Sequence, residues 1–388
     1  MNVRLVDART GEALWAELYD RELSQIFAVQ AEIADHIAAV LAPGRPNRSS
    51  PAAPRSLEAY NLYLLGRFHW GKFTPDDEVK AREYYQQAVA LDSTYAAAWA
   101  GLASVDLVLG GAPLAVTPAR YAIPSAEHAA ARALALDSAV GEAYHTLGLS
   151  LAWFDHDWAN AEQVLRLGAE HAPNDPFAHG AYGWYLRLVG RFDEAWAQTA
   201  RAVALDPLNW LFHQNAAYHL YLFRRYPQAL DRCRRVNELL EDQCSGTEAR
   251  VYLQQGQPLQ AVKRLEHSLG SSDTRPGNPL LGYAYARAGR DRDARRELAG
   301  LQHRRDRGLA SPADLALVHL GLGETHRALE LLEEAAAERP SASMLLAFIG
   351  VDPLWDPLRG RPRFQAVLQR VGLAQRLVTS GETRGTSP

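Results

Sequence analysis

Histidines are the residues of this chain most suited to ligating a metal. His145, His156 and Asp157 lie close together in sequence and would offer nitrogen and carboxylate ligands to a divalent cation. We favour another interpretation, in which the Asp-His-Asp stretch forms a solvated turn and His145 packs within a helix. His213 and His219 are six residues apart, so they do not share a helix face at the i, i+4 spacing of a metal-binding pair. We therefore predict no metal site.

The two cysteines, Cys233 and Cys244, are the other candidates for chemistry. They are too few for a disulfide framework or an all-cysteine zinc site, which fits a reducing compartment. We expect Cys233 to be an inert buried thiol at a core position. Cys244 lies near an expected loop without an adjacent basic residue to activate it. The sequence also has no P-loop, no HExxH pair and no GxSxG turn. We therefore predict no catalytic residues and no cofactor, and we do not expect an enzyme.

The strongest charge feature is the arginine-rich run from residue 275 to residue 307. It holds nine arginines against four acidic residues. The run could bind an acidic partner or, weakly, nucleic acid, but we favour the solvated face of a second helix. The whole chain has a net charge of −4, which gives no long-range attraction to nucleic acid.

Length and composition point to a large helical protein. At 388 residues the chain exceeds one ordinary core, so two domains or a repeat array are expected. Hydrophobic residues make up 47% and charged residues 22%, and alanine and leucine dominate, which favours helices. The first residues lack an apolar signal core, and no stretch approaches the roughly 18–20 apolar residues that cross a membrane. We expect a cytoplasmic protein.

One pattern recurs along the chain: a small residue, then Ala twelve residues later, then a helix-ending turn. From Pro173 to Pro207 the repeat length is 34 residues. Earlier copies contain Leu65-Gly66, Trp99 and Leu147-Gly148. The pairs twelve residues apart are Gly183 with Ala195, Ala217 with Ala229, Ala249 with Ala261, Gly282 with Ala294, and Ala316 with Ala328.

Small residues at fixed positions let two antiparallel helices approach to about 8–10 Å. Proline cannot continue a helix interior, so Pro173, Pro207 and Pro340 mark boundaries between units. A single hairpin cannot bury its apolar face, whereas a stack of hairpins can.

On these residues, the chain resembles the tetratricopeptide repeat family from about residue 56 to 340. The resemblance implies an all-α fold, a right-handed α-solenoid of about eight helix hairpins. Two copies depart from the pattern. Arg250-Val251 and Glu241 weaken the sixth copy, and an insertion between Leu109 and Ala126 must loop out of the second.

The resemblance also implies a binding face, because the first helix of each hairpin lines the concave groove. Counting from the small residue of each copy, we predict that the groove is lined by aromatic residues and arginines, the types that anchor protein interfaces. These residues are Arg67, Trp70, Trp153, Trp184, Arg187, Tyr218, Tyr221, Arg250, Tyr283 and Arg287. The alternative is that the aromatic rings pack between adjacent hairpins. The lysine and asparagine clamp of chaperone-binding members is not visible, which favours a disordered segment or a protein surface over an acidic chaperone tail.

Residues 1–42 follow a different pattern. Alternating apolar residues predict strands around Leu5 and Trp15 with a turn at Gly11, followed by a helix from Ile26. The stretches Leu5-Val6-Asp7, Thr10-Gly11, Leu14-Trp15-Ala16-Glu17, Tyr19-Asp20-Arg21 and Ile26-Phe27 resemble the closing part of a TolB-like α/β domain. Such domains precede repeats in bacterial adenylate cyclases, protein kinases and winged-helix regulators. The earlier part of that domain is missing, so we expect either a truncated start or a remnant that packs on the first repeat.

The remaining segments complete the predicted organisation. Residues 43–55 are rich in Pro and Ser and are expected to be a linker. Residues 341–373 resemble a terminal capping helix region, and residues 374–388 are expected to be a disordered tail. The sequence thus predicts a non-enzymatic module that binds a partner protein or peptide. The alternative is the separated sensory half of a signalling or transcriptional regulator, and a small-molecule enzyme is the third hypothesis.

Overall fold

The computed structural model describes residues 2–20, 26–41, 55–111, 115–269, 277–338, 344–374 and 376. Within these ranges, eight antiparallel helix hairpins follow one another. They are α2 (Leu57–Trp70) with α3 (Pro75–Leu91), α4 (Ala96–Gly110) with α5 (Ala119–Leu136), α6 (Gly141–Ser150) with α7 (Trp158–His171), α8 (Pro176–Leu188) with α9 (Phe192–Leu205), α10 (Trp210–Leu222) with α11 (Tyr226–Leu239), α12 (Ser245–Gln254) with α13 (Pro258–Leu269), α14 (Pro279–Arg287) with α15 (Asp291–Asp306), and α16 (Pro312–Gly321) with α17 (Thr325–Ala335).

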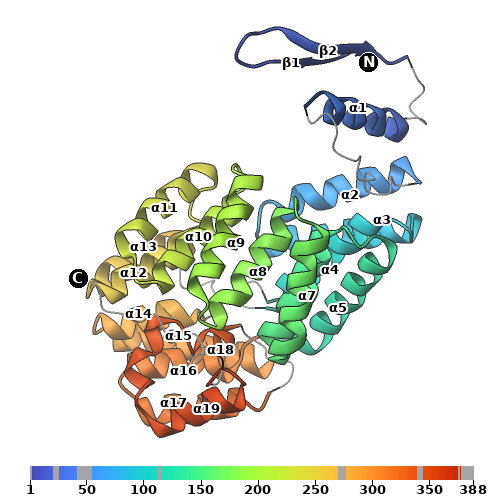
Figure 1. Cartoon of the computed structure of the whole chain (residues 1–388). Coiled ribbons are helices and arrows are strands. Elements are labelled where there is room, and N and C mark those ends of the chain that lie inside the picture. The colour runs from blue at the N-terminus through green and yellow to red at the C-terminus, as the bar shows by residue number, and fades with distance from the viewer. Residues whose placement is uncertain are drawn as a thin grey trace.

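The hairpins stack side by side into a right-handed superhelix (Figure 1). From the fourth hairpin to the seventh, the first helices begin at Pro176, Trp210, Ser245 and Pro279, 34 or 35 residues apart. The predicted all-α solenoid is therefore confirmed, including the sixth hairpin, whose sequence departs most from the pattern.

Close helix contacts explain the recurring small residues. A Cβ added at Gly148 would lie 2.3 Å from the Leu165 side chain. A Cβ at Gly66 would lie 2.5 Å from the Tyr85 ring. Gly183 has the same role in the fourth hairpin, where a Cβ would lie 2.8 Å from the Thr199 hydroxyl oxygen. Larger residues at these positions would push the paired helices apart.

In most hairpins the turn between the two helices contains one residue with left-handed backbone geometry. Gly190 supplies it between α8 and α9 with a φ of 79°, and Arg224 supplies it between α10 and α11 with a φ of 59°. Glycine tolerates this region freely, whereas a residue with a Cβ is strained there. The turns of the third to the eighth hairpins hold such a residue: His156, Gly190, Arg224, Gly256, Gly289 and Gly323.

Two sequence-based expectations require correction. Helix α5 begins at Ala119, so the looped insertion in the second hairpin ends before the predicted Ala126. The cysteines are not free thiols, because Cys233 in α11 and Cys244 before α12 form a disulfide and both are fully buried. The sequence interpretation failed because the turn between the two helices brings positions eleven residues apart to a Cα–Cα distance of 5.3 Å. Because the two cysteines are paired, they give no support to the expected reducing compartment.

The first described residues form the predicted strand pair and helix. Strands β1 (Asn2–Val6) and β2 (Ala13–Leu18) pair antiparallel, with Leu5 opposite Trp15. Helix α1 (Ile26–Leu41) follows, and its His36 ring lies 5.3 Å from the Trp15 ring. Most of the predicted linker lies outside the described residues.

Residues 344–374, which we call the terminal segment, follow the last hairpin. They contain α18 (Leu345–Phe348), the 3₁₀ helix η3 (Pro353–Leu358) and α19 (Pro362–Arg370). Contacts join α18 to α16, η3 to α12, and α19 to α17 (Figure 1). At its far end, the Trp158 indole donates a hydrogen bond of 2.5 Å to the Val371 carbonyl. The terminal segment therefore crosses the inner side of the superhelix instead of extending its end.

The superhelix also closes on itself. The Trp70 ring of α2 lies 5.8 Å from Phe177 of α8, which joins the first hairpin to the fourth. Gly308, which follows α15, lies against Arg120 of α5, so a Cβ there would be 2.9 Å from that guanidinium. No helix of the described residues is long and apolar enough to cross a membrane.

Candidate functional site

Aromatic rings from successive hairpins form a continuous row on the inner side. Trp153 lies in η2 (Leu151–Asp155), a π-helical turn that extends α6. Its ring is 5.6 Å from that of Trp184, which is 5.7 Å from that of Tyr218. The Tyr218 and Tyr221 rings lie 5.6 Å apart. Each of these rings comes from the first helix of its hairpin or from that helix's extension, so the repeat itself aligns them.

Two arginines flank the row. The Arg187 guanidinium lies 4.0 Å from the centroid of Trp184, and that of Arg250 lies 5.4 Å from the centroid of Tyr218. Both contacts have cation–π geometry. We call this group the inner cluster; it consists of Trp153, Trp184, Arg187, Tyr218, Tyr221 and Arg250.

Arg187 is a buried cation without a carboxylate. Its side chain is 0% exposed, and one guanidinium nitrogen donates a hydrogen bond of 2.6 Å to the Asn215 carbonyl. The other two nitrogens have no hydrogen-bond partner, and no aspartate or glutamate of the described residues forms an ion pair with them. Burial lowers the pKa of Arg187 to about 9, so the group still carries its charge at neutral pH. An unpaired buried charge of this kind is costly.

The terminal segment occupies the inner cluster. The Phe348 ring stands edge-on to the Trp184 and Tyr218 rings at centroid distances of 5.3 and 5.6 Å. Four residues later, the Asp352 carboxylate accepts hydrogen bonds from the Tyr218 hydroxyl at 3.1 Å and the Tyr221 hydroxyl at 2.6 Å. The Arg250 guanidinium forms an ion pair with the same carboxylate at 3.5 Å.

The electrostatics favour a bound carboxylate. Burial first, and then the negative charge of Asp352, raises the pKa of both Tyr218 and Tyr221. Both phenols therefore keep their protons and act as donors. Burial lowers the pKa of Arg250, but Tyr218 and Asp352 outweigh that effect and the net direction is upward. Two hydroxyl donors and one guanidinium thus converge on a single carboxylate.

The other predicted residues lie outside the inner cluster. Arg67 and Trp70 form their own group in α2, where the Arg67 guanidinium pairs with Glu142 at 3.1 Å and lies 4.9 Å from the Trp70 centroid. Tyr283 in α14 is buried against Gly321, and Arg287 is exposed. Of the ten residues that the repeat pattern predicts for the groove, six therefore meet in the inner cluster and four lie elsewhere. It missed Phe348 and Asp352, which lie beyond the last repeat.

Two further groups of charged side chains lie outside the inner cluster. Glu241, Asp242 and His267 form the one group of three metal-ligating side chains among the described residues. The Arg264 guanidinium already bonds to Asp242 and Glu248, so a positive charge stands where a cation would bind. This arrangement does not favour a metal.

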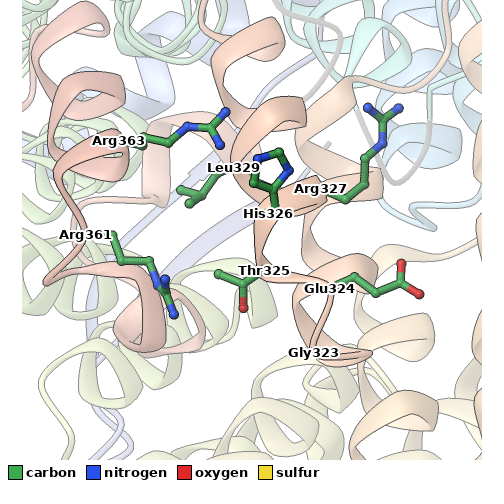
Figure 2. Close-up of a pocket in the computed structure, with 8 residues that line it drawn as sticks. All are labelled: Gly323, Glu324, Thr325, His326, Arg327, Leu329, Arg361 and Arg363. Atoms are coloured by element: carbon green, nitrogen blue, oxygen red, sulfur yellow. The ribbon is translucent and has the colours of Figure 1, made fainter.

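A pocket of about 650 Å³ lies where α17 begins, and Figure 2 shows Arg327, Arg361 and Arg363 around Thr325. Arg363 is already paired with Glu333 at 2.7 Å, and Arg327 with Glu330 at 2.9 Å. The positive charge of this pocket is therefore largely compensated.

Known proteins resemble parts of this chain. No family model matches the sequence. The chain is 31% identical over 163 residues to a curated protein named "Putative adenylate cyclase 3" from Rhizobium meliloti (strain 1021). The matched stretch covers 39% of this chain and 27% of that protein. The chain therefore spans about a quarter of that relative. Among solved structures, it is similar to the human IFIT1 dimer with m7Gppp-AAAA, at 14% identity and a TM-score of 0.50 over 80% of this chain and 78% of the other.

The period of 34 or 35 residues, the small-residue contacts and the superhelix decide the fold. The chain has the fold of a tetratricopeptide-type α-solenoid. Two solved tetratricopeptide proteins resemble it more loosely. One is from Parabacteroides merdae, at 11% identity and a TM-score of 0.43 over 69% of this chain and 100% of the other. The second is YrrB, "a TPR protein with an unusual peptide-binding site", at 21% identity and a TM-score of 0.28 over 48% of this chain and 88% of the other.

Proposed function

We propose that this tetratricopeptide solenoid is a protein-interaction module without catalytic activity, and that a segment of a partner protein binds at the inner cluster. One observation carries the proposal. The inner cluster already holds a polypeptide segment through an aromatic ring and a carboxylate, at Phe348 and Asp352. Tyrosine, tryptophan and arginine are the residue types that most often anchor protein interfaces.

The proposal is tested by removing the anchors while keeping the fold. Alanine at Tyr221 would leave a cavity, because the ring is fully buried. Trp184→Ala combined with Tyr221→Phe is therefore preferable. The matched control is Trp196→Ala with Tyr121→Phe, since Trp196 lies in α9 and Tyr121 in α5, and both side chains are exposed.

The full chain and both double variants serve as baits in affinity purification with mass spectrometry, and circular dichroism monitors folding. We expect the inner-cluster variant to lose a protein that the wild type and the control variant retain. If every captured protein is retained by a correctly folded inner-cluster variant, partner binding does not occur at this site.

A second candidate function is the regulatory part of a larger bacterial signalling or transcriptional regulator in the cytoplasm. The match to a relative named as an adenylate cyclase favours it, and so does the resemblance of residues 1–42 to a TolB-like domain. The genomic sequence upstream of Met1 tests this idea. An open frame that encodes a cyclase, kinase or winged-helix domain would support it, and a stop codon directly upstream would contradict it.

A further inference from the structure

We propose that α18 and η3 act as a built-in competitor at the inner cluster, and that the partner is an acidic segment with an aromatic side chain four residues before a carboxylate. This inference rests on the proposed function, because it names the partner's chemistry at the same site. Its first support is the way in which the inner cluster binds Asp352. One carboxylate oxygen accepts from Tyr221 and from the Leu354 amide at 2.9 Å, and the other accepts from Tyr218. The Leu354 amide belongs to the terminal segment itself, whereas the two tyrosine hydroxyls belong to the inner cluster and select a carboxylate at a defined position relative to an aromatic ring.

The second support is that the chain's own segment fits incompletely. The inner cluster contains two guanidinium groups, Arg187 and Arg250, but the segment brings one carboxylate to it. Two nitrogens of Arg187, the Trp153 indole nitrogen and the Asn215 side-chain oxygen are buried without a hydrogen-bond partner. A partner with a further acidic group could pair with Arg187. Such a partner would bind the inner cluster more tightly than the resident segment does, and displacement of that segment requires this difference in affinity.

The third support is the way the terminal segment is fastened. Helix α19 is held independently of the inner cluster, because Arg363 forms two hydrogen bonds to Glu333 of α17 at 2.7 and 2.8 Å. At the far end, Trp158 bonds to the Val371 carbonyl. When residues 345–358 leave the inner cluster, α19 keeps them tethered nearby. A tethered competitor has a high effective concentration, so an acidic partner must bind weakly until the resident contacts are loosened.

A peptide of residues 344–358 from this chain serves as the probe, with its binding to the full-length protein measured by fluorescence anisotropy. Asp352→Asn in the protein weakens the resident segment, while the peptide keeps its own aspartate. We expect this variant to bind the peptide at least about tenfold more tightly than the wild type. A peptide that carries the same Asp352→Asn change should bind at least about tenfold more weakly than the unchanged peptide. Asp231→Asn, the same change at an exposed aspartate of α11 outside the inner cluster and the terminal segment, is the matched control and should bind as the wild type does.

Equal peptide affinity for the wild type and a folded Asp352→Asn variant would overturn the inference. Hydrogen exchange of the unmodified protein provides a second measurement, in case the variant fails to fold. Amides of Phe348–Leu358 should exchange at least about tenfold faster than those of α10, and equal protection would show that the segment belongs to the permanent core. If this inference fails while the inner-cluster variant still loses a captured protein, the proposed function stands. If no partner depends on the inner cluster, that function fails whatever the peptide does.

Discussion

The hydroxyl of Tyr221 donates a hydrogen bond of 2.6 Å to the carboxylate of Asp352, 131 residues later in the chain. In a repeat array, stability arises mainly from contacts between neighbouring repeats. This bond instead joins the fifth hairpin to the segment that follows the eighth. The terminal segment therefore links repeats that are not neighbours in the array.

We expect Tyr221→Phe to lower the free energy of unfolding by about 1–3 kcal/mol. The change keeps the ring but removes one hydrogen-bond donor from the buried carboxylate of Asp352. Loss of a hydrogen bond to a buried charged group typically costs about this much free energy. Urea denaturation followed by circular dichroism measures it. Tyr121→Phe, at a position 62% exposed, should stay within about 0.5 kcal/mol of the wild type. An equal effect of the two changes would show that the Asp352 contact contributes little.

Gly183→Leu should destabilise the protein by about 1–3 kcal/mol, because the larger side chain forces α8 and α9 apart. Thermal unfolding checks this value. The control is Gly360→Leu, since a Cβ at Gly360 meets no atom within 4 Å. A Gly183→Leu variant as stable as the wild type would contradict the close-approach explanation of the repeat pattern.

Glu78 should make the protein less stable as the pH rises. Its carboxylate is fully buried and both oxygens lack a partner. Burial, with a smaller contribution from Asp77, raises its pKa from 4.5 to about 8. Between these values the folded state keeps a proton that the unfolded state has released, so stability falls from about pH 4.5 to pH 8. The loss is on the order of 3 kcal/mol at pH 7.

Glu78→Gln should remove this dependence and raise the stability at pH 8, as urea denaturation at several pH values would show. Glu83→Gln, at an exposed position of the same helix, should retain the wild-type pH profile. If the free energy of unfolding changed with pH in the same way for the wild type and Glu78→Gln, Glu78 would not be the cause of the pH dependence.

Loss of the disulfide should lower the free energy of unfolding by about 3 kcal/mol, as expected from a bond that closes a loop of this size. Cys233 and Cys244 are eleven positions apart and join α11 to the start of α12. Thermal unfolding with and without reductant measures the change. The Cys233→Ala, Cys244→Ala double variant should match the reduced wild type and show no response to reductant. A reductant effect on that variant would mean that another process is being measured.

The hairpins could be predicted from the sequence because their determinants are local. Gly183 and Ala195 are twelve residues apart, and that spacing recurs from the fourth hairpin to the eighth. The same periodicity indicated which side chains share the inner face, so Trp184 and Tyr218 were found together. The fold class could be predicted because the same local pattern occurs in one repeat after another.

The rest could not be predicted because it depends on contacts between distant positions. Phe348 and Asp352 lie outside the period, and no local pattern indicates that they return to α8 and α10. The disulfide depends on the turn before α12, where Asp242 has a φ of 64°. Pro124 lies inside α5 although proline disfavours helix interiors, so this helix departs from what local preference indicates.

The span of the terminal segment has a consequence for how this protein can evolve. Repeat arrays ordinarily lengthen or shorten by duplication or deletion of whole units. Here one stretch of chain is bonded both to Trp158 in the third hairpin and to Glu333 in the eighth. An extra hairpin between them would separate the two attachment points by another step of the superhelix, and one fewer would bring them too close. The number of hairpins in this interval is therefore fixed, unlike in an open-ended solenoid.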